Sequence, residues 1–195
     1  MNDKLARIRV IIVTDGDWTA RQAVETAAHA LKLHPLKAVA GNPMLLTGPQ
    51  VLQKILQAPC EPVVLMVDDK GHKGVGAGER VIEYLLYQSE QVEVLGVIAV
   101  ASHSRARGTR VDYSVTGDLQ VVKGHPVTKE GTLEPPRHRR LEGDTVQILD
   151  RYPDLLVVGC GDPGKMDGQD SIINGAEVTR KCLELILEGS EFLAQ

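Results

Sequence analysis

The stretch "VVGCGDPGKM", residues 157–166, has the spacing that most resembles a nucleotide site. It fits G-x-G-x-x-G and, up to its lysine, G-x-x-x-x-G-K, patterns in which backbone N–H groups and a lysine bind phosphate. The residues that carry this pattern are Gly159, Gly161, Gly164 and Lys165. However, Pro163 lacks an N–H and Met166 replaces the magnesium-binding hydroxyl. The alternatives are a nucleotide site and a tight glycine turn, and these two residues favour the turn.

Carboxylates that follow predicted strands form a second pattern. They are Asp15, Asp17, Asp68, Asp69 and Asp162. The carboxyl ends of parallel strands share one sheet edge, where ligands usually bind. Carboxylates gathered there would need a hard cation or basic side chains to offset their repulsion. The alternative is that each acid caps a helix or forms a turn, as Asp17 could do.

Calcium or magnesium suits the oxygen chemistry of such a rim. The candidate metal ligands are Asp15, Asp68, Asp69 and Asp162. Lys70, Lys165 or the arginine loops could balance the charge instead. The strand order decides whether these acids converge, and the sequence does not give that order. No G-x-S-x-G or H-E-x-x-H motif is present, so we name no catalytic residue.

Two short segments are strongly basic although the chain has a net charge of −4. The first, residues 102–110, contains Arg105, Arg107 and Arg110, and the second, residues 136–140, contains Arg137, Arg139 and Arg140. We interpret these arginines as candidate contacts to a membrane or a partner protein. The alternative is ordinary solvated loop charge.

The elements that must position these residues alternate along the chain. Apolar runs at 8–14, 62–69, 92–102 and 154–159 predict buried strands, and 36–43 predicts a weaker one. Amphipathic helices are predicted between these strands. A further helix is predicted at 143–152, and a last one from an Asn174 cap to a stop at Gly189. Right-handed crossovers then give one α/β domain over residues 1–195. We expect a three-layer α/β/α fold, Rossmann-like or flavodoxin-like, with a mainly parallel sheet and a small β-hairpin insertion turning at Gly117-Asp118.

Composition excludes several classes of protein. The 195 residues include only one Phe, one Trp and four Tyr, too few for a platform that stacks single-stranded nucleic acid. The three cysteines form no C-x-x-C motif, which favours reduced core thiols. No apolar run reaches the roughly 18–20 residues of a membrane span, and the N-terminal run is too short for a signal peptide. Any membrane role is therefore expected to be peripheral.

Eight motifs occur in an order that resembles one family. They are "VTDGD" (13–17), "AGNP" (40–43), "DDKGHKGVGAGE" (68–79), "VLGVIAVAS" (94–102), "TRVDYSV" (109–115), "GDTV" (143–146), "VVGCGDPGKMDGQD" (157–170) and "TRKCLELILE" (179–188). The chain resembles the stage V sporulation protein AE family, specifically its soluble SpoVAEa-type member, over nearly its whole length. The segments 103–107 and 128–140 match least well.

The resemblance implies a protein of endospore-forming bacteria. Its operon partners would be SpoVA membrane proteins of the spore inner membrane, which move dipicolinic acid chelated with calcium, together with a germinant-receptor-A-like subunit. No catalytic residue is carried over from the resemblance, and the sequence contains no recognisable catalytic constellation. We therefore expect a non-enzymatic accessory subunit in the forespore or spore, peripheral at that membrane, with anionic lipid as a further contact. The alternative is a magnesium-dependent enzyme acting on a nucleotide or phosphorylated substrate. A homo-oligomer is compatible with either hypothesis.

Overall fold

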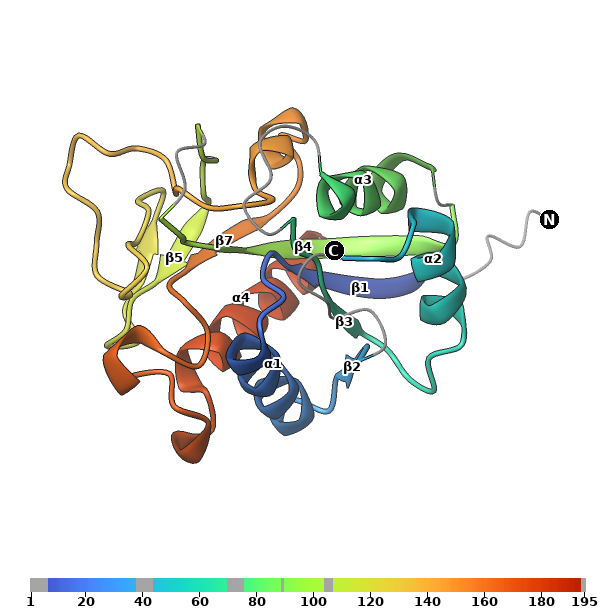
Figure 1. The fold of residues 1–195 in the computed structure, drawn as a ribbon, viewed down its shortest axis with the longest axis horizontal. Coiled ribbons are helices and arrows are strands. Elements are labelled where there is room, and N and C mark those ends of the chain that lie inside the picture. Colours follow the sequence, from blue (N-terminus) through green and yellow to red (C-terminus); the bar gives the residue numbers. More distant parts are fainter. Residues whose placement is uncertain (1–6, 38–43, 70–75, 89, 104–106, 194–195) are drawn as a thin grey trace.

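A computed structural model describes residues 7–37, 44–69, 76–88, 90–103 and 107–193. Seven strands form one sheet in the order β2-β3-β1-β4-β7-β5-β6 (Figure 1). The strands are β1 (Ile8–Val13), β2 (His34–Pro35), β3 (Val63–Met66), β4 (Val92–Val100), β5 (Tyr113–Val115), β6 (Val121–Lys123) and β7 (Val157–Cys160). The α-helices in these residues are α1 (Trp18–Ala30), α2 (Gly48–Leu56), α3 (Ala77–Glu83) and α4 (Glu177–Leu193).

The sheet is parallel except at one edge. β1 pairs with β3 and β4, β4 pairs with β7, and β7 pairs with β5, all in parallel. β6 alone runs antiparallel, to β5. The predicted hairpin is therefore confirmed, and it also extends the main sheet through β5. Because β1, β3, β4 and β7 point the same way, the loops that follow them leave from one edge.

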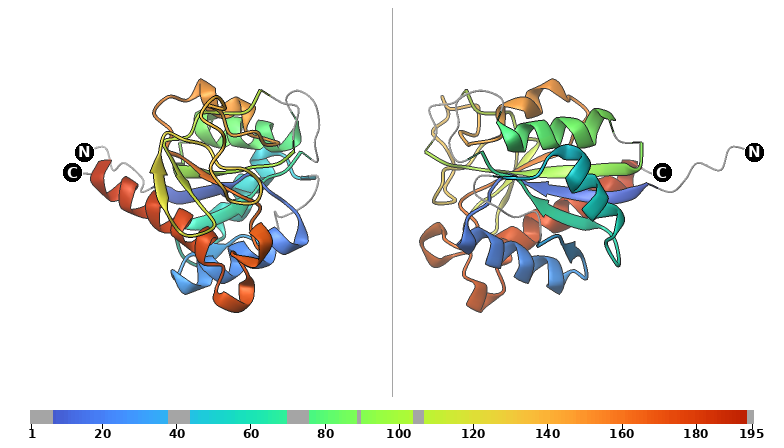
Figure 2. Two further views of the ribbon diagram at one scale, coloured as in Figure 1. Left: turned by 90° about the vertical axis from the view of Figure 1, so that its left-hand side faces the viewer. Right: turned by 45° about the vertical axis from the view of Figure 1, so that its right-hand side comes forward.

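Helices cover both faces of the sheet, which confirms the three-layer fold. Ala23 and Ala27 of α1 and Leu183 and Ile186 of α4 pack on the face that contains Ile11 of β1. On the other face, Val51 and Ile55 of α2 and Val81 and Ile82 of α3 pack with Ile12 of β1. Figure 2 shows the sheet between these two helical layers. Alternate residues of β1 thus enter opposite cores, as the pleat of a strand buried on both faces requires.

Three predictions of local structure were wrong. The strand expected at 36–43 is instead the short β2, His34–Pro35, and residues 38–43 lie outside the described residues. The helix expected at 143–152 is reduced to one 3₁₀ segment, η2 (Gln147–Arg151), which ends just before Tyr152 and Pro153. Finally, α4 runs past Gly189 to Leu193 because the face that includes Ile186 stays packed on the sheet.

The cysteines are only partly as expected. Cys160 in β7 and Cys182 in α4 are buried thiols, but Cys60 is exposed, which corrects the prediction of three core thiols. A hydrogen bond with Cys182, together with burial, raises the pKa of the Cys160 thiol well above its usual range. In the described part of the chain, none of the helices has the length and apolar character needed to cross a bilayer.

Candidate functional site

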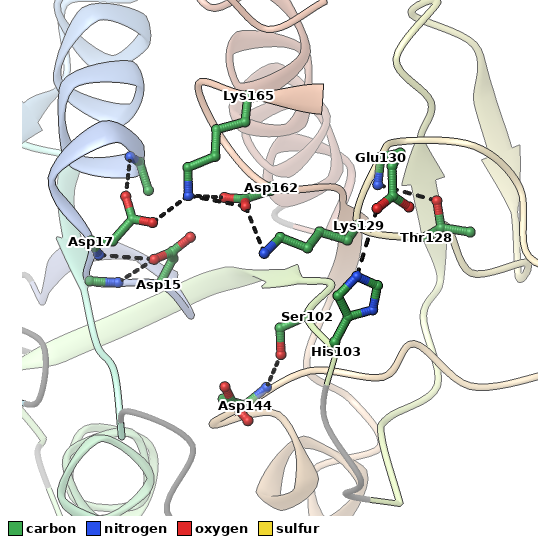
Figure 3. A network of polar contacts seen from close by, with 12 residues as sticks. Asp15, Asp17, Ser102, His103, Thr128, Lys129, Glu130, Asp144, Asp162 and Lys165 are labelled. Carbon is green, nitrogen blue, oxygen red and sulfur yellow. Dashed lines mark hydrogen bonds and ion pairs between the residues drawn. The ribbon is translucent and has the colours of Figure 1, made fainter. Parts of the chain in front are cut away.

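A cavity of about 350 Å³ lies where β1, β3, β4 and β7 end. Its walls are built from Thr14, Asp15, Asp17, Asp68, Val100, Ala101, Ser102, Lys129, Asp144, Asp162 and Lys165. Five of these side chains are carboxylates and two are lysines. The strand order therefore brings together acids that are about 150 residues apart in the sequence, as open parallel sheets do at their carboxyl edge (Figure 3).

The first two acids are held by the turn between β1 and α1. Oδ1 of Asp15 accepts hydrogen bonds from the N–H groups of Gly16, at 2.6 Å, and Asp17, at 3.0 Å. Asp17 is the N-cap of α1, because its Oδ1 accepts from the N–H of Ala20 at 2.9 Å. The interpretation of Asp17 as a cap is confirmed. Its second oxygen, Oδ2, remains directed to the cavity, so one side chain serves both the helix and the site.

Lys165 joins the acids of two strand ends (Figure 3). Its Nζ lies 2.5 Å from Oδ2 of Asp17 and 3.1 Å from both carboxylate oxygens of Asp162. A second lysine, Lys129, places its Nζ 3.3 Å from Oδ2 of Asp162. Asp162 is almost completely buried, and a buried charge of this kind requires paired partners. The two lysines supply them.

This setting shifts the pKa values of Asp15, Asp17 and Lys165 in different ways. Burial, with the charges of Asp17 and Asp162 nearby, raises the pKa of Asp15 to about 6. Burial acts in the same direction on Asp17, but the hydrogen bonds from Lys165 and the Ala20 N–H outweigh it and lower the pKa of Asp17. Burial opposes the charge of Lys165, yet Asp17 and Asp162 raise its pKa. Asp15 is thus the acid whose protonation changes near neutral pH.

Asp15, Asp17 and Asp162 offer an arrangement that suits a divalent cation. Each contributes a carboxylate oxygen, and these three atoms lie within 4.8 Å of one another. Calcium and magnesium take such oxygen ligands. Lys165 occupies the space among these acids, because its Nζ contacts carboxylate oxygens of both Asp17 and Asp162. The donor set therefore fits calcium or magnesium if the ammonium group of Lys165 moves away.

The remaining predicted acids have separate positions. Asp68 is buried and lines the cavity. Asp69 instead bonds to the start of α3, accepting from the N–H groups of Gly78 at 2.6 Å and Glu79 at 3.2 Å. Because both of its oxygens serve the helix, Asp69 fits the alternative of a cap rather than that of a rim ligand. Lys70 lies outside the described residues.

The glycine segment has the geometry of a turn. The N–H of Asp162 donates to the Lys129 carbonyl, that of Lys165 to the Asp162 carbonyl, and that of Gly164 to Oδ2 of Asp170. These N–H groups are thus bonded within the protein and do not form a phosphate cradle. The glycines instead permit close packing.

Each glycine of the segment has a different neighbour that excludes a side chain. A Cβ at Gly159 would meet Oγ of Ser114 at 2.4 Å, and one at Gly161 would meet the N–H nitrogen of Gly131 at 2.8 Å. Gly164 has φ +77°, and its Cβ would lie 2.9 Å from the Thr19 carbonyl oxygen. Packing therefore accounts for the spacing that resembles a dinucleotide motif.

The N-terminus of α4 is also occupied by the chain itself. Oδ1 of Asp170 accepts from the N–H groups of Val178, at 2.9 Å, and Thr179, at 3.0 Å. Oδ2 accepts from the Thr179 hydroxyl at 2.6 Å. The prediction that Asn174 caps this helix was wrong, because Asn174 lies in the preceding 3₁₀ segment, Ile172–Asn174. The completely buried Asp170 takes that role.

The arginines do not behave alike. Arg105 lies outside the described residues, and Arg137 and Arg139 are exposed. Arg140 is half-buried and forms an ion pair with Asp150. Arg107 and Arg110 are exposed and lie near enough to Arg140 to lower its pKa, although burial contributes most to that effect. The two basic segments thus meet, which the sequence did not indicate.

Sequence reasoning missed several residues of the cavity. Lys129 belongs to an irregular segment with no recognisable motif, and it reaches Asp162 because the 128–132 turn packs on Gly161. Ser102 accepts a hydrogen bond from the Asp144 N–H at 3.2 Å. The motifs "VLGVIAVAS" and "GDTV", in which Ser102 and Asp144 lie, were the only signal that could have found them.

Fold and site together define a three-layer α/β protein with a carboxylate and lysine cluster at the carboxyl edge of its sheet. The family model described as Stage V sporulation protein AE1 matches residues 9–190. The chain belongs to the stage V sporulation protein AE family, and membership implies a role in the SpoVA machinery of sporulation. No curated protein and no solved structure matches the chain.

Proposed function

We propose that this protein is a non-enzymatic accessory subunit of the SpoVA machinery that moves calcium dipicolinate and serves spore germination. It would act at the spore inner membrane through contacts with SpoVA proteins and a germinant-receptor-A-like subunit. The observation that carries this proposal is the family match over residues 9–190. Since none of the described helices is suited to span a bilayer, the proposed contact with the membrane is peripheral.

The state of the strand-edge site supports a binding role. Lys165 and Lys129 already neutralise Asp17 and Asp162 through hydrogen-bonded ion pairs. A general acid or base needs a titrating group that is free to reach a substrate. Asp15 has a pKa raised to about 6, whereas the pKa of Asp17 is lowered by its bond to Lys165 and to the Ala20 N–H. The cluster is therefore better suited to exchange between two states, one paired with Lys165 and one paired with a bound cation, than to catalytic turnover.

We propose calcium as the ion that drives this change. Calcium would bind oxygens of Asp15, Asp17 and Asp162 and displace the ammonium of Lys165. Ionised Asp15 is then stabilised by the cation, whereas without the cation its ionisation is opposed by burial and by its acidic neighbours. Lys165 lies in the loop that follows β7, so its movement on calcium binding would change that loop. A partner protein that contacts the loop could then distinguish the two states.

Calcium titration by isothermal calorimetry tests this role. Asp15→Asn and Asp162→Asn should weaken calcium binding about tenfold or more, because each removes a charged ligand. Asp167→Asn is the matched control, since Asp167 is an exposed acid outside the cavity. Equal affinities in all three variants would exclude a calcium site at the strand edge.

A capture experiment tests the accessory role itself. Tagged full-length chain, cross-linked in sporulating cells, should recover SpoVA membrane proteins. Spores that carry Asp15→Asn should release dipicolinic acid more slowly than spores that carry Asp167→Asn. Recovery of no SpoVA protein would contradict the accessory role, whatever the calcium affinity of the site.

A magnesium-dependent enzyme is the second candidate function. The clustering of three carboxylate oxygens within 4.8 Å of one another favours it, because magnesium bound by carboxylates can activate phosphoryl chemistry. Hydrolysis of a common nucleotide that requires magnesium, and that is lost in Asp68→Asn and Asp15→Asn but kept in Asp167→Asn, would establish this alternative. Absence of turnover across a nucleotide panel favours the accessory role.

A further inference from the structure

A second cavity, of about 390 Å³, lies between α3 and η2 and is separate from the strand-edge site. Its walls are built from Glu79, Arg107, Gly108, Arg140, Gln147, Ile148, Asp150 and Arg151. Three arginines from three different segments of the chain therefore share one pocket. Its size lies within the range of pockets that bind small ligands.

The pocket exists because the two basic segments are joined. Thr109 and Leu141 form an antiparallel bridge with N–H···O distances of 3.0 and 2.8 Å. Beside it, the Arg140 guanidinium donates to the carbonyls of Arg107 and Gly108 at 3.1–3.3 Å. Gly108, with φ +71°, allows this approach, since a Cβ there would lie 2.4 Å from the Leu141 carbonyl oxygen.

Only part of the positive charge is neutralised within the protein. Asp150 pairs with Arg140 and is itself fixed by the Thr109 hydroxyl and the Arg110 N–H, each at 3.1 Å. Arg151 has an exposed ion pair with Glu83 at 3.6 Å, which contributes little.

The charges of Arg107, which lines the pocket, and of Arg110 are not paired with an acid in the part of the chain that the structure describes. Within the described ranges, the exposed side chains of Arg107 and Arg110 have no ion pair and donate no hydrogen bond. The buried Glu79 carboxyl also lines the pocket; burial and the nearby Asp69 raise its pKa, whereas the charge of Arg151 acts in the opposite direction. Three arginines of the pocket wall thus face two carboxylates, Glu79 and Asp150, and positive charge is in excess there.

We infer that this pocket binds a phosphate group, held by Arg107 and Arg151 and oriented by the fixed guanidinium of Arg140. Arginine suits this ligand because its planar fork pairs with two phosphate oxygens at once. Gln147 lies on the pocket wall and can donate a further hydrogen bond. A free phosphate compound and a phospholipid headgroup present the same chemistry. The inference does not depend on the proposed accessory role.

Calorimetry with inorganic pyrophosphate as the probe tests the site. Arg107→Ala and Arg151→Ala should each weaken pyrophosphate binding about tenfold, because each removes a charge-assisted hydrogen-bond donor. Arg139→Ala is the matched control, since it removes the same charge from an exposed position in the second basic segment that does not line the pocket. All three side chains are exposed, so the variants should unfold at the wild-type temperature.

Vesicles distinguish the two sources of phosphate. Co-sedimentation is measured with phosphatidylcholine vesicles that contain or lack phosphatidylglycerol. Binding to the anionic vesicles that is lost in Arg107→Ala and Arg151→Ala, but kept in Arg139→Ala, identifies a headgroup. Pyrophosphate binding with the same dependence, without vesicle binding, identifies a free phosphate compound. Equal weakening by Arg139→Ala, or no binding of either probe to the wild-type chain, overturns the inference.

Discussion

Two carboxylates near the carboxyl edge of the sheet, Asp170 and Asp15, have opposite surroundings. Asp170 is completely buried and accepts four hydrogen bonds, three of them from the first turn of α4. Asp15 lines the cavity, and its Oδ1 accepts two hydrogen bonds from its own turn. The pKa of Asp15 is raised to about 6.

The difference shows that a residue type alone does not identify a site. Asp170 is part of the fold because every donor around it would be left unsatisfied without it. Asp15 is held in place but its ionisation is opposed by burial and by Asp17 and Asp162, and a ligand can relieve that opposition. Acids of the first kind should affect stability most, and acids of the second kind should affect binding and pH dependence.

Replacement of Asp170 should have the largest effect on stability. Asp170→Ala leaves the buried N–H groups of Val178 and Thr179, and the partly buried N–H of Gly164, without acceptors. We expect a loss of about 3–5 kcal/mol in the free energy of unfolding, measured by urea denaturation. Asp170→Asn keeps one acceptor oxygen and should lose less. A loss below about 1 kcal/mol for Asp170→Ala would contradict the structural role.

The glycine turn gives the next largest effect. Gly164→Ala should cost about 2–3 kcal/mol, because φ is +77° and the new Cβ would lie 2.9 Å from the Thr19 carbonyl oxygen. Gly168→Ala is a matched control, since Gly168 has φ +86° but no atom within 4 Å of the added Cβ. It should cost about 1 kcal/mol. Equal losses would show that packing on α1 does not explain this glycine.

Asp15 should have a smaller and pH-dependent effect. Because the folded-state pKa of Asp15, about 6, exceeds the ordinary value of 3.8, ionisation destabilises the folded protein as pH rises through this interval. Asp15→Asn removes that cost and keeps an oxygen for the N–H groups of Gly16 and Asp17. We expect it to stabilise the protein by about 1–2 kcal/mol at pH 7.5, with the gain disappearing below about pH 4.

Urea denaturation across this pH range measures the effect. Asp167→Asn, at an exposed position on the same edge, should change stability by less than about 0.5 kcal/mol at every pH. A gain for Asp15→Asn that is constant between pH 4 and 7.5 would show that the charge of Asp15 is not the cause.

The sequence was sufficient to predict the layers of the fold. Strands that are buried on both faces consist of continuous apolar residues, such as "PVVLMV", whatever their order in the sheet. The sequence predicted that acids follow β1, β3 and β7, but not which of them meet. Asp69 accepts hydrogen bonds from the start of α3, whereas Asp162 lies beside Asp17. This difference depends on the strand order and on the contacts of Lys165. Lys129 could not be predicted, since tertiary packing of an irregular turn places it.

Lys165 should have the smallest effect on stability and a large effect on the site. Its side chain is 41% exposed, so Lys165→Met should cost only about 0.5–1 kcal/mol without divalent ions. Lys181→Met, which removes a similarly exposed ion pair with Glu184, should cost the same or less.

The two lysine variants should differ in calcium affinity. Removal of the Lys165 ammonium frees the oxygens of Asp17 and Asp162 and should raise calcium affinity about tenfold, whereas Lys181→Met should leave it unchanged. If Lys165→Met instead weakened calcium binding, Lys165 would support the bound state and would not compete with the cation.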